Sequence, residues 1–278
     1  MRLLAATITA LLTMACAQAE TVTLAMPSKL EARAAYLAGQ PGKPLVLILH
    51  GFLQTQEFPT VHRLAEGLHN EGYTVLAPTF SLGVPHRKKS FACEAIHTHT
   101  FQEDFRELDR WMKWLREKGH TSFVAIGHSQ GSAELLAYLL GKPALPARRF
   151  IGVSIVDASA SRDVAANKRI EQDLRSRVAR GDHSVVTYPI SYCSRFMGTP
   201  ASLLSYQEWS SERILNALKR LTVPTTLIMG SSDDRLGPNW IEQLQKTGKT
   251  VHVIQGANHF LDGQYEFDLL DLVLADLK

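Results

Sequence analysis

The sequence predicts an α/β fold built on a mostly parallel central sheet with helices on both faces. Apolar runs of strand length alternate along the chain with longer segments of helical period, and this alternation is typical of parallel strands that are joined by helices. The chain has 278 residues, of which 45% are hydrophobic, so it can bury a sizeable core. Because one alternating pattern covers the chain, we expect one domain rather than two.

Individual elements follow from the local patterns. Two leading strands are expected at 22–27 and 30–37, and the continuous apolar run at 44–50 predicts a buried central strand. Apolar residues recur at three- and four-residue spacing in 102–118, which predicts a helix with its aromatic side chains in the core. Further strands are expected at 74–78, 122–127, 150–156, 225–229 and 250–255, and further helices at 58–71 and 132–140.

The first nineteen residues are predicted to be a secretory signal that is cleaved after Ala19. Arg2 precedes an apolar run at 3–16, which ends in an Ala-Gln-Ala cleavage pattern. The run is shorter than the roughly 20 apolar residues that cross a bilayer, so a membrane anchor is disfavoured. Lipid attachment at Cys16 is a minor alternative, because Thr13 departs from the Leu-x-x-Cys pattern that bacterial lipoprotein signals resemble. The mature protein is therefore expected to be periplasmic or secreted.

Removal of this signal would leave Cys93 and Cys193, an even pair in a protein expected to mature in an oxidising compartment. We predict a disulfide between them, with two unpaired buried thiols as the alternative. The neighbouring His97 and His99 suggest metal binding as a third interpretation, but their spacing does not fit a metal-ligand pattern. Both histidines are therefore expected to be structural, and no metal is expected.

The balance of charge argues against nucleic acid as a partner. The chain has 30 Lys and Arg against 27 Asp and Glu, and its formal net charge is +3. These residues are spread along the sequence, whereas proteins that follow a phosphate backbone gather basic residues on one face.

The sequence Gly127-His128-Ser129-Gln130-Gly131 lies where the strand 122–127 runs directly into the helix 132–140. A sharp strand-to-helix turn holds the side chain at its tip in a strained backbone conformation, and glycines two residues to either side avoid the collisions of a Cβ. Ser129 is therefore expected to project from the edge of the sheet. The helix behind it directs free N–H groups and a positive dipole end toward an oxyanion, which favours attack on a carbonyl.

This motif resembles the nucleophile elbow of the α/β-hydrolase superfamily, whose triad runs in the order Ser, acid, His. The segment 230–234, after the strand 225–229, resembles the acid loop of the family. The segment 256–260 contains His259, follows the strand 250–255 and resembles its histidine loop. The resemblance covers nearly all of the chain after residue 19. It implies the α/β-hydrolase fold, with Ser129 as nucleophile and His259 as general base.

The acidic member of the triad has two candidates. Counting three residues forward from Gly230 selects Asp233. Counting four residues back from Pro238, a proline that family members often carry after the acid, selects Asp234. We favour Asp233 and keep Asp234 as the alternative, because spacing is the evidence for both.

The resemblance also implies an oxyanion hole made by the backbone N–H groups of Phe52 and Gln130. Gln130 follows the nucleophile, and Phe52 belongs to a His50-Gly51-Phe52 sequence that resembles the His-Gly pattern of the family. We interpret His50 as a structural residue that holds this loop. His128 flanks the nucleophile without being required by the chemistry.

The connection between the strands at 150–156 and 225–229 is too long for an ordinary loop, so we interpret about 159–221 as a cap inserted before the acid-bearing strand. Ile170, Leu174 and Val178 stand at four-residue spacing and predict an amphipathic helix lying over the core. The segment 188–209 mixes apolar residues without a clear period. It is expected to form a wall of the substrate pocket or to serve packing alone.

Together these features predict a serine hydrolase that cleaves carboxylic esters through an acyl-enzyme, with no cofactor. The expected substrate is a small-molecule or lipid ester. Nothing in the pattern indicates membrane contact, and the oligomeric state is left open. The first alternative is a serine peptidase or amidase with the same triad. The second is a catalytically silent binding protein on the same scaffold.

Overall fold

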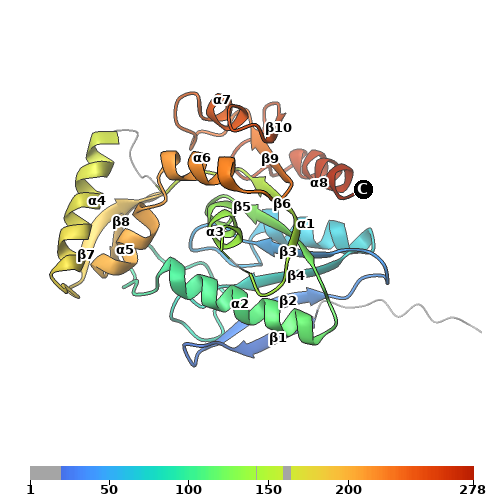
Figure 1. Ribbon diagram of the computed structural model, residues 1–278, viewed down its shortest axis with the longest axis horizontal. Coiled ribbons are helices and arrows are strands. Elements are labelled where there is room, and N and C mark those ends of the chain that lie inside the picture. The colour runs from blue at the N-terminus through green and yellow to red at the C-terminus, as the bar shows by residue number, and fades with distance from the viewer. Residues whose placement is uncertain (1–19, 142, 159–163) are drawn as a thin grey trace, which may run out of the picture.

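The computed structural model describes residues 20–141, 143–158 and 164–278 (Figure 1). The predicted signal segment at 1–19 lies outside these residues, as do the first residues of the predicted cap. Within the described ranges, the structure contains no helix with the length and apolar character to span a membrane.

An eight-stranded sheet in the order β1-β2-β4-β3-β5-β6-β9-β10 forms the centre of the molecule (Figure 1). The leading strands pair antiparallel, β1 with β2 and β2 with β4, and all other neighbours pair parallel. This confirms the mostly parallel sheet. The strands are β1 (Glu20–Ala25), β2 (Glu31–Leu37), β3 (Leu45–Leu49), β4 (Thr74–Thr79), β5 (Phe123–His128), β6 (Ala147–Val153), β9 (Thr225–Gly230) and β10 (Thr250–Ile254).

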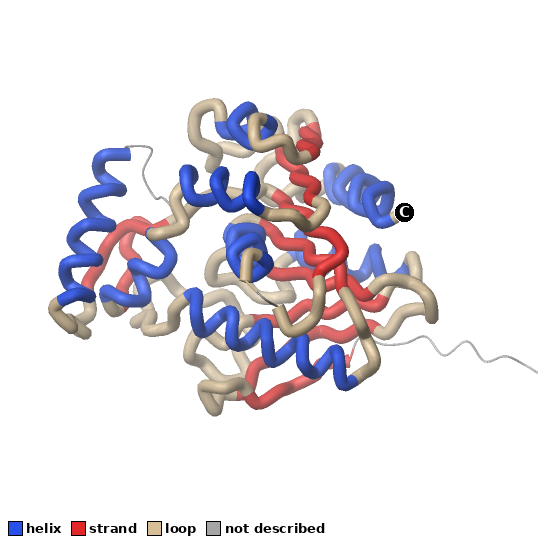
Figure 2. The backbone as a smooth tube through the Cα atoms, viewed as in Figure 1, coloured by secondary structure: helices blue, strands red, loops and turns tan. Residues whose placement is uncertain are grey.

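Helices cover both faces of this sheet, and alternate residues of each strand enter opposite cores. In β3, Leu47 packs on one face while Val46 and Ile48 pack on the other. The first face is covered by α2 (Phe101–Glu117), α3 (Gln130–Leu139) and α6 (Ser211–Arg220), and the second by α1 (Pro59–Asn70) and α8 (Tyr265–Leu277) (Figure 2). The remaining helix of this part, α7 (Trp240–Gln245), packs beside β10.

The insertion between β6 and β9 contains α4 (Val164–Ala179), a hairpin of β7 (Val186–Ile190) and β8 (Cys193–Gly198), and α5 (Pro200–Gln207), followed by α6. The predicted amphipathic helix is α4, and it meets the core through Leu174, which lies in the main hydrophobic cluster, and Ile170, which packs against that cluster, but not through Val178. In α4, whose residues are all described, Leu174 alone is buried, and Val178 is exposed. The helix packs on α5 at the outer side of the insertion, because the sheet face nearby is already covered by α3 and α6 (Figure 1).

The predicted disulfide between Cys93 and Cys193 is present, with the two Cα atoms 5.6 Å apart. It joins the loop after β4 to the first residue of β8. A backbone bridge between His97 and Gly198 runs beside it, and the ring of His97 stacks on Phe196 at 4.1 Å between centroids. The insertion is therefore fastened to the main body by a covalent bond and by packing.

At the carboxyl ends of the parallel strands, where the site lies, two element boundaries differ from the predicted ones by more than one residue. The strand predicted at 150–156 is β6 and ends at Val153, because Ser154 adopts a left-handed φ of 49° and turns the chain. The helix predicted to start at residue 132 begins at Gln130, directly after the turn at Ser129.

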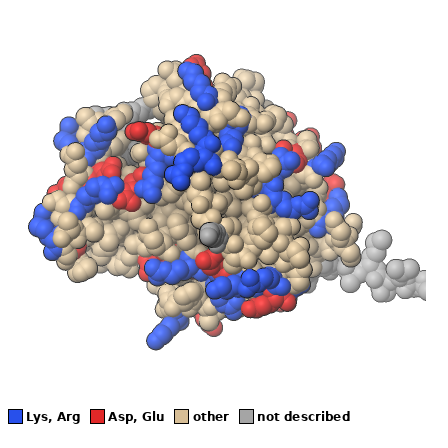
Figure 3. Space-filling view, viewed as in Figure 1, with Lys and Arg blue, Asp and Glu red and all other residues tan. Residues whose placement is uncertain are grey.

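Lys and Arg side chains are interspersed with Asp and Glu on the face that carries α2, α3 and α6 (Figure 3).

Candidate active site

Ser129 occupies the turn between β5 and α3 in a strained conformation, with φ 56° and ψ −126°. Neighbouring glycines make this turn possible. A Cβ on Gly127 would lie 2.5 Å from Ser132 Cα, and a Cβ on Gly131 would lie 2.3 Å from the carbonyl oxygen of His50. Larger residues at either position would force the backbone apart, so the two glycines of the motif are needed for the close packing of α3 on the sheet.

The structure brings together Ser129, His259 and Asp233 from three separate loops. The Nε2 atom of His259 lies 2.8 Å from the Oγ atom of Ser129, and its Nδ1 atom lies 2.7 Å from an Oδ atom of Asp233. All three residues are buried, whereas the neighbouring Asp234 is exposed. With Asp233 as a carboxylate, the ring proton sits on Nδ1, so Nε2 is left to accept the hydroxyl proton of Ser129.

A second histidine, His128, holds the loop that carries His259. Its Nε2 atom donates to the carbonyl oxygen of His259 over 3.1 Å, and its ring stacks on Phe58. Burial, and next the proximity of His259, lower the pKa of His128 to about 3. His128 is therefore neutral at physiological pH and contributes packing and one hydrogen bond.

The backbone N–H groups of Phe52 and Gln130 are placed beside the nucleophile. Gln130 is the first residue of α3, and a Cβ on Gly51, the residue before Phe52, would lie 3.3 Å from Ser129 Cβ. Among the residues that the structure describes, none accepts a hydrogen bond from either N–H group. These two donors are thus available to a negatively charged oxygen bound next to Ser129.

His50 fixes the peptide group that carries the Phe52 N–H. The backbone N–H of Phe80 donates to His50 Nε2 over 3.2 Å, so the ring proton sits on Nδ1, which donates to the Gly51 carbonyl oxygen over 2.8 Å. Burial, followed by the nearby Arg87, lowers the pKa of His50 to about 3 and keeps the ring neutral. Because the carbonyl of Gly51 is held on one side, the N–H of the same peptide group points to the other.

The insertion closes over this loop through Tyr192, a residue that sequence reasoning missed. The Tyr192 hydroxyl donates to the Phe52 carbonyl oxygen over 3.2 Å, and the two rings pack edge to face. The one signal in the sequence that could have indicated Tyr192 is its position directly before the disulfide-bonded Cys193. Tyr192 and Arg235 also line an open cleft of about 1360 Å³ between the insertion and the main body.

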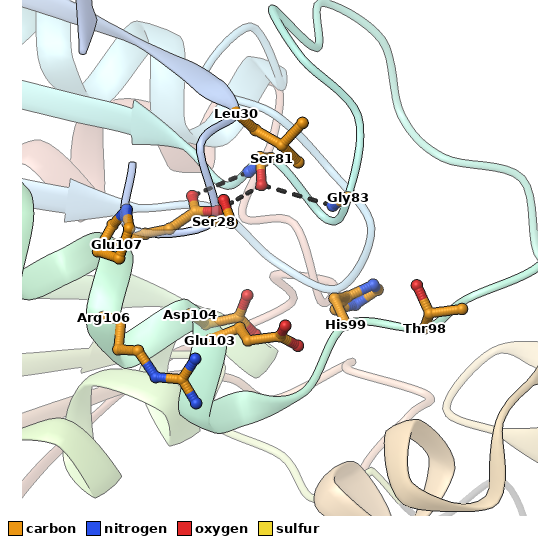
Figure 4. A pocket seen from close by; sticks show the side chains of 11 residues that line it. Ser28, Leu30, Ser81, Gly83, Thr98, His99, Glu103, Asp104, Arg106 and Glu107 are labelled. Carbon is orange, nitrogen blue, oxygen red and sulfur yellow. Dashed lines mark hydrogen bonds between the residues drawn. The ribbon is translucent and has the colours of Figure 1, made fainter. Parts of the chain in front are cut away.

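A second, much smaller cavity of about 80 Å³ lies beside α2, and Ser129 is not among the residues that line it (Figure 4). Its walls include His99 and the carboxylates of Asp104 and Glu107, and Glu107 accepts hydrogen bonds from Ser81. Within the described part of the chain, no group of three His, Cys, Asp or Glu side chains is arranged to hold a metal ion.

Comparison with known proteins places the fold in a family. The sequence pattern of the alpha/beta hydrolase family matches residues 46–266, which is most of the chain and includes every residue of the site described above. The chain belongs to the alpha/beta hydrolase family. Comparison with curated protein sequences gives no significant match.

Solved structures with the same fold are similar over almost their whole length. The alpha/beta hydrolase GrgF from Penicillium sp. sh18 has a TM-score of 0.71 at 14% identity, covering 94% of this chain and 98% of that one. The monoacylglycerol lipase of Paleococcus ferrophilus has a TM-score of 0.66 at 17% identity, with coverages of 89% and 98%. Est1E from Butyrivibrio proteoclasticus has a TM-score of 0.64 at 15% identity, with coverages of 92% and 98%. At these identities the similarity concerns the fold.

Proposed function

We propose that this protein is a serine hydrolase that cleaves carboxylic esters through an acyl-enzyme intermediate. The observation that carries the proposal is the continuous chain of contacts from Asp233 through His259 to Ser129, at 2.7 and 2.8 Å. A serine hydroxyl is a weak nucleophile until an adjacent imidazole removes its proton, and the carboxylate on the far side of the ring stabilises the imidazolium that forms.

In the first half of the reaction, the Ser129 oxygen forms a bond to the ester carbonyl carbon while its proton moves to His259 Nε2. The carbonyl oxygen becomes an oxyanion and accepts hydrogen bonds from the N–H groups of Phe52 and Gln130. When this intermediate collapses, the bond to the alcohol oxygen breaks, and the alcohol leaves with the proton from His259. The acyl group remains bound to Ser129 as an ester.

In the second half, water replaces the alcohol. His259 Nε2 takes a proton from the water, whose oxygen attacks the acyl carbon and again creates an oxyanion in the same place. Collapse of this intermediate breaks the bond to Ser129 and returns the proton to its oxygen, so the carboxylic acid is released and the site is restored. No other group is required for this balance of bonds and protons.

A small-molecule or lipid ester is the substrate that we propose. The cleft beside Tyr192 and Arg235 mixes apolar and charged walls, which suits a molecule with an acyl part and a polar part. It is lined by Asp234, the neighbour of the triad acid, and by none of the three triad residues, so it would hold the part of the substrate that lies away from the scissile bond. We also propose that the protein is exported, with residues 1–19 as its signal. The Cys93–Cys193 disulfide supports this proposal, because such bonds persist mainly in oxidising compartments.

The test is hydrolysis of p-nitrophenyl esters from acetate to palmitate by the mature protein and by Ser129→Ala. We expect activity in the wild type and a loss of at least about 10⁴-fold in kcat in the variant, since nucleophile removal in serine hydrolases costs that much or more. Ser184→Ala, which changes an exposed serine between α4 and β7, should match the wild type.

Two other outcomes would overturn the proposal. If no ester is hydrolysed while an organophosphonate probe still labels Ser129, the same triad serves a peptidase or an amidase. If the probe does not label Ser129 either, the protein is a binding protein on a hydrolase scaffold.

A further inference from the structure

Arg87 reaches from the loop after β4 to the oxyanion loop, which we define as residues 51–54. Its Nη1 atom donates to the Leu53 carbonyl oxygen over 3.1 Å, and its Nη2 atom donates to the Gln54 carbonyl oxygen over 2.7 Å. Its Nε atom donates to the Phe80 carbonyl oxygen over 2.8 Å, and Nη1 also donates to Lys89 over 3.1 Å. Arg87 as a whole residue is 6% exposed, so these bonds form largely out of contact with bulk water.

All four of these hydrogen bonds go to backbone carbonyl oxygens, and within the described ranges none goes to a carboxylate. A buried guanidinium is costly unless its donors are satisfied, and a planar fork can satisfy them only where the acceptors are already arranged to fit it. Burial is the largest influence on Arg87 and lowers its pKa to about 10, while the nearby buried Asp104, Glu107 and Glu134 act in the opposite direction. Asp104 and Glu107 are seen in Figure 4. Two of the four hydrogen bonds thus go to the oxyanion loop, and the other two, to Phe80 and Lys89, anchor the guanidinium beside it.

The carbonyl groups of the oxyanion loop are each held by a partner outside the loop. Gly51 is held by His50 and Phe52 by Tyr192. Gln54 is held by Arg87, and Leu53 is held by Arg87 together with the backbone N–H of Phe91. Arg87 and His50 are themselves tied to one residue, because Arg87 binds the Phe80 carbonyl oxygen and His50 accepts from the Phe80 N–H. Arg87 therefore fixes the end of the loop that is distal to His50.

The loop needs such a support because of its conformation. Leu53 has a φ of 58°, in the left-handed region that non-glycine residues avoid. The Leu53 carbonyl oxygen also accepts from the Phe91 N–H over 2.8 Å, so loss of Arg87 would remove one of its partners. It would also remove the 2.7 Å bond to the Gln54 carbonyl oxygen, and this end of the loop could then relax toward an ordinary φ. Such a change would move the neighbouring Phe52, whose N–H we assign to the oxyanion hole.

We propose that Arg87 is a positioning residue for the reaction: it holds the oxyanion loop so that the Phe52 N–H points at the oxyanion. The inference rests on the proposed function, since it assumes attack by Ser129 on a carbonyl. Arg87 makes no contact with the substrate in this account. It acts through the Leu53 and Gln54 carbonyl groups.

The experiment compares p-nitrophenyl butyrate with O-(p-nitrophenyl) thionobutyrate, in which sulfur replaces the carbonyl oxygen. Sulfur accepts N–H hydrogen bonds poorly, so the preference of a variant for the oxygen ester reports how well its oxyanion hole works. For Arg87→Met we expect kcat on the oxygen ester to fall about 10- to 100-fold with little change in KM. This loss is smaller than the loss caused by removing an oxyanion donor, because the Phe52 N–H would be displaced and not removed. The preference for the oxygen ester should fall several-fold as well.

Arg87→Lys is the second variant, because it keeps the charge but lacks the fork that bonds two loop carbonyls at once. We expect it to lie between the wild type and Arg87→Met, and it decides the question if Arg87→Met does not fold. Lys249→Met is the matched control. Lys249 also donates to a backbone carbonyl, that of Leu221, at the opposite end of the sheet, so both esters should be hydrolysed as in the wild type.

A purely structural role of Arg87 predicts a different result. Partial unfolding would reduce hydrolysis of both esters by the same factor and leave their ratio at the wild-type value, and that outcome in either folded Arg87 variant would overturn the proposal. Failure of the proposed function is seen separately, because the wild type would then show no ester hydrolysis that depends on Ser129.

Discussion

Two adjacent carboxylates, Asp233 and Asp234, have opposite surroundings. Asp233 is buried, accepts from His259 Nδ1, and also accepts a hydrogen bond from the backbone N–H of Arg235. Asp234 is exposed. Since successive residues in an extended turn point in different directions, a shift of one position decides which carboxylate reaches the ring.

We predict that Asp233→Asn lowers kcat for ester hydrolysis by about 10⁴-fold, because an amide in this place favours the wrong ring tautomer of His259. The matched variant Asp234→Asn should stay within about threefold of the wild type, since it alters the same chemical group outside the contact. Steady-state kinetics on one p-nitrophenyl ester measure both. An equal loss in the two variants would contradict the assignment of Asp233 as the triad acid.

At the scale of residues, the sequence identified Ser129 and His259 as candidates. Each lies in a motif whose order in the chain and flanking strands are characteristic of the α/β-hydrolase superfamily. It left Asp233 and Asp234 open, because spacing along a loop does not fix side-chain direction. It did not single out Arg87 or Tyr192. Their roles come from contacts to backbone carbonyl groups that are distant in sequence, and such contacts leave no periodic pattern.

At the scale of elements, the apolar runs predicted the parallel strands well, because buried strands of this kind are nearly continuous in hydrophobicity. The hairpin of β7 and β8 was not predicted. Much of it is half-buried or exposed, so its sequence lacks the alternation that marks a strand with one buried face. The packing of α4 on α5 was not predicted for a related reason, since periodicity indicates an apolar stripe and not the partner that covers it.

The disulfide is the strongest tie between this hairpin and the body. We predict that Cys93→Ser combined with Cys193→Ser lowers the free energy of unfolding by about 2–5 kcal/mol, because the bond closes a loop with a sequence separation of 100. Ester hydrolysis should fall too, since Tyr192, the neighbour of Cys193, would hold the Phe52 carbonyl less firmly. Urea denaturation and kinetics test the two effects.

The control for this variant is Tyr192→Phe, which removes the hydroxyl contact and leaves the disulfide intact. It should reduce activity with a much smaller change in stability. Unchanged stability in the double serine variant would contradict the prediction.

For the molecule as a whole, ionisable groups buried around the oxyanion loop couple folding to pH. Burial is the first cause that lowers the pKa of His50, His99 and His128 to about 3 in the folded protein. Between pH 6.5 and about 3 the unfolded chain binds protons that the folded chain does not, so each histidine makes the free energy of unfolding fall as pH falls through this window. Burial raises the pKa values of Asp104 and Glu134. Above their ordinary pKa values the folded chain therefore keeps protons that the unfolded chain has lost, so these two groups make the free energy of unfolding fall as pH rises.

His99 offers a direct test of this coupling. It is buried, and neither ring nitrogen has a hydrogen-bond partner among the described residues. We predict that His99→Phe stabilises the protein and that the gain grows as pH falls below 6.5, by at most about 1.4 kcal/mol per pH unit. Urea denaturation of both proteins at several values between pH 4.5 and 8 measures the difference. A gain that does not depend on pH would contradict the prediction.

The Cys93–Cys193 bond also determines what a protease can do to the molecule. It closes a covalent ring in the chain, and Ser129 lies inside this ring while Asp233 and His259 lie outside it. A single peptide cleavage between the two cysteines therefore opens the ring without releasing a fragment. For a cleavage between Ser129 and Cys193, the part that bears the nucleophile and the part that bears the base stay covalently joined for as long as the bond is oxidised, and this covalent link is lost only when the bond is reduced as well.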